Sequence, residues 1–263
     1  MSIENYVTAF SFHRNPEPVG NPLTALCLLQ PPNQIFLPFF RKNGIILYKG
    51  RNSMGFPVYD YRTDIRNVLV TPQIRSRFLK MEPGQSAQLH SHDLGHEIFL
   101  ILEGRVEFTI DGETEELGPG QMCVALVDEP HSVRVLGDEP MTMYLSVTPH
   151  IHPTHTPRAD SGERLPHNFA SARAYDVEPD VQISVSELVT RQIHASQLLA
   201  ELTETCAAVQ QEMGAQLTEA LASGDTAAAE AARKAMWEAL YPVYRAVSEL
   251  GDVWNALAPR ATP

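Results

Sequence analysis

Residues 84–104 of the chain have the sequence Gly-Gln-Ser-Ala-Gln-Leu-His-Ser-His-Asp-Leu-Gly-His-Glu-Ile-Phe-Leu-Ile-Leu-Glu-Gly. His90 and His92 are two residues apart, so on an extended chain both imidazoles leave the same face. The polar, glycine-containing residues 93–96 predict a bend that brings the carboxylate of Glu97 beside them. We interpret this segment as the ligand-bearing part of a metal-holding β-barrel.

His131, which lies far downstream after another predicted strand, is the candidate fourth ligand. Two or three imidazoles and one carboxylate leave coordination positions open for water or substrate, as divalent transition metals require for chemistry. His96 adjoins Glu97, and neighbouring strand residues point to opposite faces, so we expect it outside the site. The alternative is that His96 replaces Glu97, which requires a bend shifted by one residue.

The spacing of these residues resembles the first sequence motif of the cupin superfamily. That motif is Gly, five residues, His-x-His, three or four residues, Glu, six residues and Gly. Every element is met here, from Gly84 through the histidine pair and Glu97 to Gly104, with four residues between His92 and Glu97.

The second cupin motif is matched in part. Gly120 and His131 fall where the motif has its Gly and its metal-binding His. Leu126, Asp128 and Val135 replace its Pro, inner Gly and Asn. The resemblance covers residues 56–148 and implies a small jelly-roll barrel. It also implies a metal held near the barrel mouth by His90, His92, Glu97 and His131.

The composition excludes several classes of partner. A formal net charge of −12 argues against nucleic acid or an anionic membrane surface as the main partner. Cys27, Cys123 and Cys206 form no CxxC pair, so neither a disulfide framework nor a zinc knuckle is indicated. The apolar run 23–29 is short and lacks a basic lead-in, so we expect no signal peptide or membrane span. A cytoplasmic location is the expectation.

Short segments between turn residues predict a mainly β fold, a cupin-type jelly-roll barrel over residues 56–148. Asp111-Gly112 is a hairpin signal, because both positions tolerate positive φ. We predict that residues 97–102, which are nearly all apolar, form a strand buried on both faces. The expected strands are 56–61, 66–71, 74–81, 97–102, 105–110, 121–127, 131–136 and 141–148.

Regions of different character flank the barrel. Residues 1–55 are proline-interrupted but apolar, which predicts an irregular arm packed on the barrel or on a neighbouring subunit. Residues 149–182 predict a Pro-rich linker or a loop lying across the barrel. Residues 183–259 carry two amphipathic stripes, which predict an α-helical hairpin.

Local signals set the ends of the two predicted helices. Ser184 or Ser186 caps the first helix, residues 223–225 end it, and Pro242 should kink or split the second. The first helix would run about 55 Å at 1.5 Å per residue, which is longer than a small barrel. We therefore predict a homodimer or higher homo-oligomer through the helices and the N-terminal arm.

Other polar residues have a functional and an ordinary interpretation. His150, His152 and His155 follow the last barrel strand and either line its mouth, as proton carriers or a second metal site, or are solvated loop residues. The sequence favours solvated histidines, because no carboxylate or glycine frame accompanies them. Arg75 and Arg77 share one strand face, which either holds a substrate carboxylate or is simply solvated.

Two functions fit this pattern. The favoured one is a mononuclear non-haem metal enzyme acting on a small-molecule substrate, with dioxygenase-type oxidation first and lyase or isomerase chemistry as further options. Fe²⁺ is the favoured metal, and Mn²⁺, Ni²⁺ or Zn²⁺ suit the same ligands. The alternative is a non-catalytic module that binds a small ligand or metal and assembles through its helices. No separate catalytic acid or base is identified from the sequence.

Overall fold

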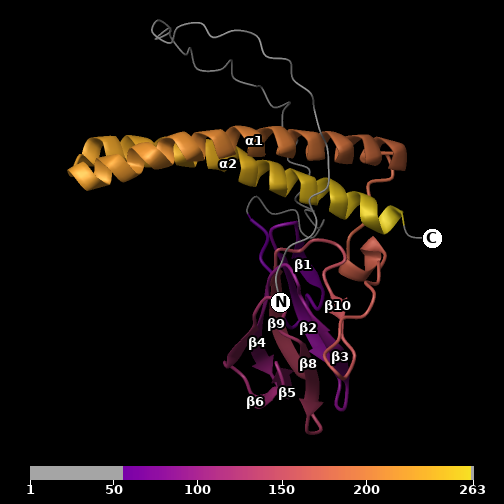
Figure 1. Ribbon diagram of the computed structural model, residues 1–263. Coiled ribbons are helices and arrows are strands. Elements are labelled where there is room, and N and C mark those ends of the chain that lie inside the picture. Colours follow the sequence, from indigo (N-terminus) through magenta and orange to yellow (C-terminus); the bar gives the residue numbers. More distant parts are fainter. Residues whose placement is uncertain (1–55, 262–263) are drawn as a thin grey trace, which may run out of the picture. The chain divides into compact units, whose positions relative to one another are not determined.

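The computed structural model describes residues 56–261 of the 263-residue chain. The expected N-terminal arm, residues 1–55, lies outside the described residues. Within the described part, two five-stranded antiparallel sheets face each other and two long helices follow them (Figure 1). This is the cupin-type sandwich with a helical pair that the sequence predicts.

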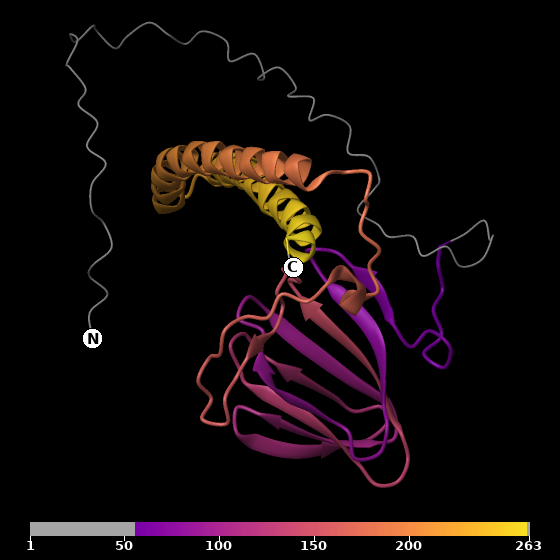
Figure 2. The same cartoon turned by 90° about the vertical axis from the view of Figure 1, so that its right-hand side faces the viewer.

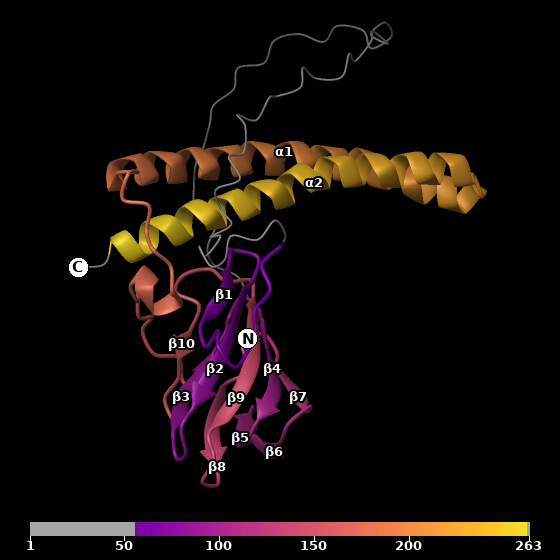
Figure 3. The ribbon, with the colours of Figure 1, turned by 180° about the vertical axis from the view of Figure 1, so that it is seen from behind.

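The first sheet has the strand order β1-β2-β9-β4-β7, and Figure 3 shows β9 between β2 and β4. Its strands are β1 (Asn67–Val70), β2 (Arg75–Met81), β9 (Met141–Thr148), β4 (His96–Glu103) and β7 (Met122–Ala125). The second sheet has the order β10-β3-β8-β5-β6. Its strands are β10 (Thr156–Pro157), β3 (Ser86–Ser91), β8 (His131–Leu136), β5 (Arg105–Ile110) and β6 (Glu113–Leu117).

Strand register brings together residues that are distant in the sequence. His90 on β3 lies directly opposite His131 on β8. In the other sheet, Glu97 on β4 and Arg75 on β2 both lie opposite Val147 of the central strand β9. His90 and His131 therefore come from one sheet, and Glu97 comes from the sheet that faces it.

An apolar core fills the space between the sheets, which Figure 2 views from the side. Alternation along the strands turns Phe99 of β4 and Phe108 of β5 inward, where their ring centroids are 4.7 Å apart. The core consists of Met81, Phe99, Ile101, Val106, Phe108, Leu117, Ala125, Val133, Val135, Met141, Met143 and Leu145. The ring of His131 lies 5.7 Å from that of Phe99, so the polar cluster adjoins the core.

The two long helices pack as an antiparallel pair, as expected from their short connection (Figure 1). Helix α1 (Val185–Ser223) starts at Ser184, whose hydroxyl accepts a hydrogen bond from the Glu187 amide at 3.1 Å. Gly224, at φ 74°, ends α1, and helix α2 (Thr226–Leu257) follows. No helix within residues 56–261 is long and apolar enough to cross a membrane.

The structure corrects three local predictions. Residues 56–61 form no strand: Phe56 is 82% exposed and Pro57 has no amide hydrogen to pair. Strand β4 alternates between buried and half-buried positions, so only one of its faces is fully buried. Pro242 does not split the second helix: α2 is continuous through that residue, with Ala232 and Ala246 buried on either side of it.

Candidate metal centre

Four side chains, three from strands of the two sheets and one from the turn after β3, converge on one point. One ligand atom from each lies within 4.8 Å of every other, and the four residues are His90, His92, Glu97 and His131. The side chains of His92, Glu97 and His131 are only 3–4% exposed, whereas that of His90 is 19% exposed. The point is therefore enclosed, with its most open side at His90.

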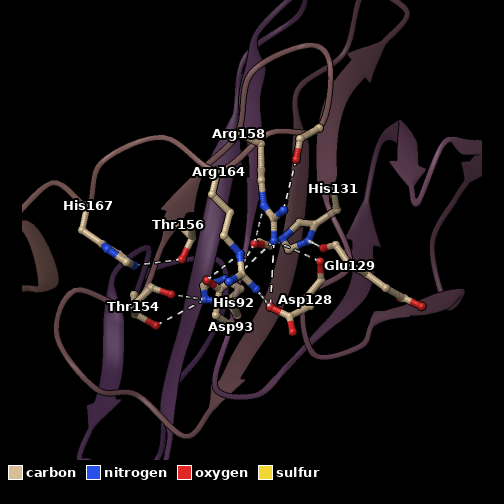
Figure 4. Close-up of polar contacts among 12 residues, drawn as sticks. His92, Asp93, Asp128, Glu129, His131, Thr154, Thr156, Arg158, Arg164 and His167 are labelled. Carbon is tan, nitrogen blue, oxygen red and sulfur yellow. Dashed lines mark hydrogen bonds and ion pairs between the residues drawn. The ribbon is translucent and has the colours of Figure 1, made fainter. Parts of the chain in front are cut away.

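Backbone carbonyls orient all three imidazoles. The Nδ1 of His90 lies 2.8 Å from the carbonyl oxygen of Gln88, and that of His131 lies 2.9 Å from that of Glu129. His92 uses a distant partner, the carbonyl oxygen of Thr154 at 2.5 Å (Figure 4). Because a carbonyl oxygen only accepts, each Nδ1 carries the hydrogen and donates it. Each Nε2 is thereby left to face the cluster.

The Nε2 atoms meet a single carboxylate oxygen. Oε2 of Glu97 lies 2.8 Å from Nε2 of His92, 3.0 Å from that of His131 and 3.9 Å from that of His90. Nitrogen lone pairs and a carboxylate oxygen repel one another at these distances unless a positive charge lies between them. The neutral imidazoles and the buried carboxylate therefore fit one metal ion, with the second nitrogen of each ring already bonded as metal-binding histidines require.

The pKa values within the cluster fit this assignment. Burial alone would raise the pKa of Glu97, but its close contacts with His131 and His92 and the charge of Arg75 hold that pKa well below its usual value. Burial lowers the pKa of His90 to about 4, with His131 adding to the effect. The carboxylate is ionised and the His90 ring is neutral near pH 7, as metal ligands must be.

Arg75 lies behind the carboxylate of Glu97. The sequence allowed a solvated strand face for this residue, and the structure does not show one. Arg75 is 3% exposed, and its Nη2 is 3.7 Å from Oε1 of Glu97. The guanidinium also lies over the Tyr175 ring, 5.4 Å from its centroid. A buried cation at this place balances the carboxylate and fixes its rotation, so that Oε2 is turned to the histidines. Arg77 is half-buried and is not one of the four converging residues.

The prediction of solvated loop histidines is wrong. His150 and His152 are each 2% exposed, and both rings pack edge-on against Tyr175. His155 packs on the cluster itself, with its ring centroid 4.9 Å from those of both His90 and His92. His96 lies outside the cluster, as expected, and its Nδ1 accepts a hydrogen bond from the amide of Val127.

His150 makes a testable contribution to acid sensitivity. Burial, together with the nearby charge of Arg75, lowers the pKa of His150 to about 3. Below pH 6.5 the unfolded chain takes up a proton that the folded state excludes, so stability falls as the pH falls. Between pH 6.5 and pH 5 this one group should remove about 2 kcal/mol of unfolding free energy. Urea unfolding of wild type and His150→Phe should show that difference in pH dependence; equal pH dependence would contradict it.

Gly95 allows the turn between His92 and Glu97 to pass under the end of β9. A Cβ at this position would lie 2.0 Å from the carbonyl oxygen of Thr148 and 2.5 Å from Cδ of Pro149. Gly95→Ala should therefore cost at least about 2 kcal/mol of unfolding free energy. Gly214→Ala in α1, where nothing lies within 4 Å, is the control and should be neutral or stabilising. Equal stabilities of the two variants in urea would refute the close approach.

An ionic network attaches the segment after β9 to the same turn (Figure 4). Arg158 donates to the hydroxyl of Ser91 at 2.9 Å and lies 3.4 Å from Asp93. Arg164 lies 3.4 Å from Asp93 and 2.6 Å from Asp128. Residues 156–164 are therefore joined to the turn that carries His92, and part of the predicted linker belongs to the site.

The end of helix α2 holds the preceding part of that segment. Asn255 accepts a hydrogen bond from the amide of His152 and donates one to the carbonyl of His150, both at 2.8 Å. The indole of Trp254 donates to the carbonyl of His152. Two residues further on, Thr154 supplies the carbonyl that orients His92. A chain of hydrogen-bonded groups thus leads from α2 to the cluster.

Part of the chain is similar to known proteins. A family model described as a cupin domain matches residues 77–148. The polyketide synthase CurC of Streptomyces cyaneus is 34% identical over 91 residues, which cover 33% of this chain and 59% of that protein. The match thus spans less than two thirds of the length of this curated relative.

Solved structures also match the barrel. A conserved protein with a double-stranded β-helix domain from Klebsiella pneumoniae is 21% identical, with a TM-score of 0.34, over 36% of this chain and 91% of that one. A salicylate 1,2-dioxygenase from Pseudoaminobacter salicylatoxidans is 22% identical, with a TM-score of 0.27, over 29% of this chain and 20% of that one.

Proposed function

Since residues 77–148 form a cupin domain, we propose that the chain is a mononuclear metal enzyme that oxidises a small organic molecule with dioxygen. The observation that carries the proposal is the convergence of three Nε2 atoms on one buried carboxylate oxygen. Such a donor set holds a divalent transition metal and leaves coordination positions free. Iron(II) is the first choice, because its open sites in oxygenases use histidine and carboxylate ligands; manganese, nickel and zinc suit the same atoms.

A bound metal would supply Lewis acidity or one-electron redox chemistry to a substrate held beside dioxygen. The protein's own residues prepare the place. Arg75 keeps Glu97 ionised and oriented, and the carbonyls of Gln88, Glu129 and Thr154 fix the three rings. The buried Phe99 closes the side toward the core, and His90 is the most exposed of the four side chains.

A substrate that presents two oxygen atoms fits the open positions best. The relative in Streptomyces cyaneus is described as a polyketide synthase, and polyketides carry oxygen atoms in 1,3 relation along their chains. This favours 1,3-diketones and related phenols as the first compounds to test. Decarboxylation-type lyase reactions and isomerisations can also use a substrate that binds a metal through two oxygen atoms. These reactions are therefore the next to assay.

The test has two stages. The purified chain is analysed for bound metal, and oxygen uptake is then measured with diketones, catechols, flavonols and thiols on protein reconstituted with iron(II), manganese(II), nickel(II) or zinc(II). We expect one metal per chain and oxygen uptake with at least one of these compounds. Tight metal without turnover in oxygen or lyase assays would support a non-catalytic binding module instead.

We also propose that the helical pair forms a homo-oligomer. The residues that α1 and α2 bury are mostly small, such as Ala195 and Ala232, whereas Trp237, Tyr241 and Tyr244 on α2 are 51–64% exposed. Light scattering should give at least twice the mass of one chain. The double substitution Trp237→Glu and Tyr244→Glu should lower this mass. A monomeric wild type would refute the proposal.

A further inference from the structure

A cavity of about 300 Å³ lies beside the metal centre, between the turn at residues 92–95 and the segment 149–169. Figure 4 shows three of its lining residues, Thr154, Thr156 and His167, next to His92. Leu94, Ile151 and Phe169 contribute apolar walls. Neither the fold family's four-residue cluster nor the proposed chemistry assigns a role to this space.

The size of the cavity indicates what it can hold. A dry protein cavity of about 150 Å³ accepts benzene, so twice that volume suits a molecule of about two fused rings. The apolar walls provide the burial that drives binding of such a molecule. The cavity is too small for a peptide or a nucleotide to bury most of its surface.

The charges around the cavity favour a neutral occupant. Asp93 is the one acidic residue among its lining residues, and it is already engaged by Arg158 and Arg164. Among residues 56–261, no lysine or arginine lines the cavity, so an anion would find no counter-charge from this part of the chain.

One polar group in the wall lacks a partner. The Nε2 of His152, a residue that is only 2% exposed, makes no hydrogen bond among the described residues. Because burial lowers the pKa of His152, its ring is neutral near pH 7. Nε2 of that ring can then donate or accept one hydrogen bond, depending on the tautomer. A buried nitrogen without a partner is costly, and a hydroxyl or carbonyl group of a ligand would satisfy it.

The cavity shares a wall with the metal centre. His92 and Thr154, the two partners of the 2.5 Å bond that orients the His92 ring, both line it. A molecule bound there therefore touches the group that positions a metal ligand.

We propose that this cavity binds the body of the substrate, a neutral, flat organic molecule of about two rings. A hydroxyl or carbonyl group of that molecule would form a hydrogen bond with His152. The identification of this molecule as the substrate rests on the proposed function. The ability of the cavity to bind such a molecule is independent of that function.

Calorimetry with 2-naphthol, a neutral two-ring probe without a chelating oxygen pair, tests the cavity. We expect one binding site per chain and at least tenfold weaker binding of 2-naphthoate, which has the same rings and a negative charge. Absence of 2-naphthol binding, or equal affinity for the anion, would overturn the proposal.

Variants locate the binding. Leu94→Trp fills the cavity from a residue that is 64% exposed and should weaken 2-naphthol binding at least tenfold. Leu126→Trp, at a residue that is 51% exposed and does not line the cavity, should leave it unchanged. His152→Phe should weaken binding about fivefold, and Phe169→Ala is a second wall variant if Leu94→Trp folds poorly. Equal affinity in all variants would place the probe elsewhere.

Metal content, measured on the same samples, separates the two proposals. Binding of 2-naphthol by protein that takes up no metal would refute the proposed enzyme and keep the cavity as a ligand site. Full metal content without 2-naphthol binding would refute the cavity and keep the enzyme.

Discussion

Glu97→Gln should lower the affinity for a divalent metal by more than ~100-fold, while the barrel stays folded. Removal of a residue that only orients a metal ligand costs less than this. The substitution keeps the shape of the side chain but removes its charge. The new amide group donates two hydrogens, and the Nε2 atoms of His92 and His131 lie 2.8 and 3.0 Å from the oxygen that it replaces. The variant therefore satisfies the lone pairs that a metal would otherwise use.

Cobalt(II) is a suitable probe, because its visible absorption reports ligand type and geometry. Titration of wild type should saturate at one ion per chain, and titration of Glu97→Gln should show no saturable band. Glu107→Gln makes the same chemical change at a carboxylate on β5 that pairs with Arg134, and it should bind cobalt like wild type. Retention of full cobalt affinity in Glu97→Gln would show that Glu97 is not a metal ligand and would refute the proposed metal centre.

The local part of the site could be predicted from the sequence. His90, His92 and Glu97 lie within eight residues, so strand alternation and one glycine-containing bend are enough to bring them together. His131 required the second motif, and its position opposite His90 comes from pairing of β3 with β8. Turn residues also placed β5, β8 and β9 correctly, because each begins after a polar or glycine-containing turn.

The supporting residues could not be found in this way. Arg75 reaches Glu97 only because β9 lies between β2 and β4, and strand order depends on how the whole sheet assembles. The polar, Pro-rich composition of residues 149–182 is typical of solvated linkers, and it misled the interpretation of His155. Residues 150–156 of that segment are buried or half-buried because β10 pairs with β3 and α2 binds the chain just before it. Both are contacts between distant parts of the sequence.

Asn255→Ala should lower metal affinity by about 10- to 100-fold although Asn255 touches no ligand of the metal centre. Its amide satisfies two main-chain groups, the His152 amide and the His150 carbonyl, at 2.8 Å each. Alanine leaves both without a partner at a cost of about 1–3 kcal/mol each, so the segment will shift to find new ones. Thr154 moves with it, and the carbonyl that holds Nδ1 of His92 is displaced.

Loss of stability alone would not produce this effect, and a matched variant in the same helical pair shows the difference. Gln210 also donates its side-chain amide to a main-chain carbonyl, that of Met236 at 2.8 Å, but far along the sequence from the segment that carries Thr154. Gln210→Ala should reduce the melting temperature without changing cobalt affinity or its absorption spectrum. Asn255→Ala should reduce both the melting temperature and the affinity and should alter the spectrum, because the orientation of His92 changes. If the two variants bind cobalt equally well and with the wild-type spectrum, helix α2 supports the barrel but does not position its metal ligand.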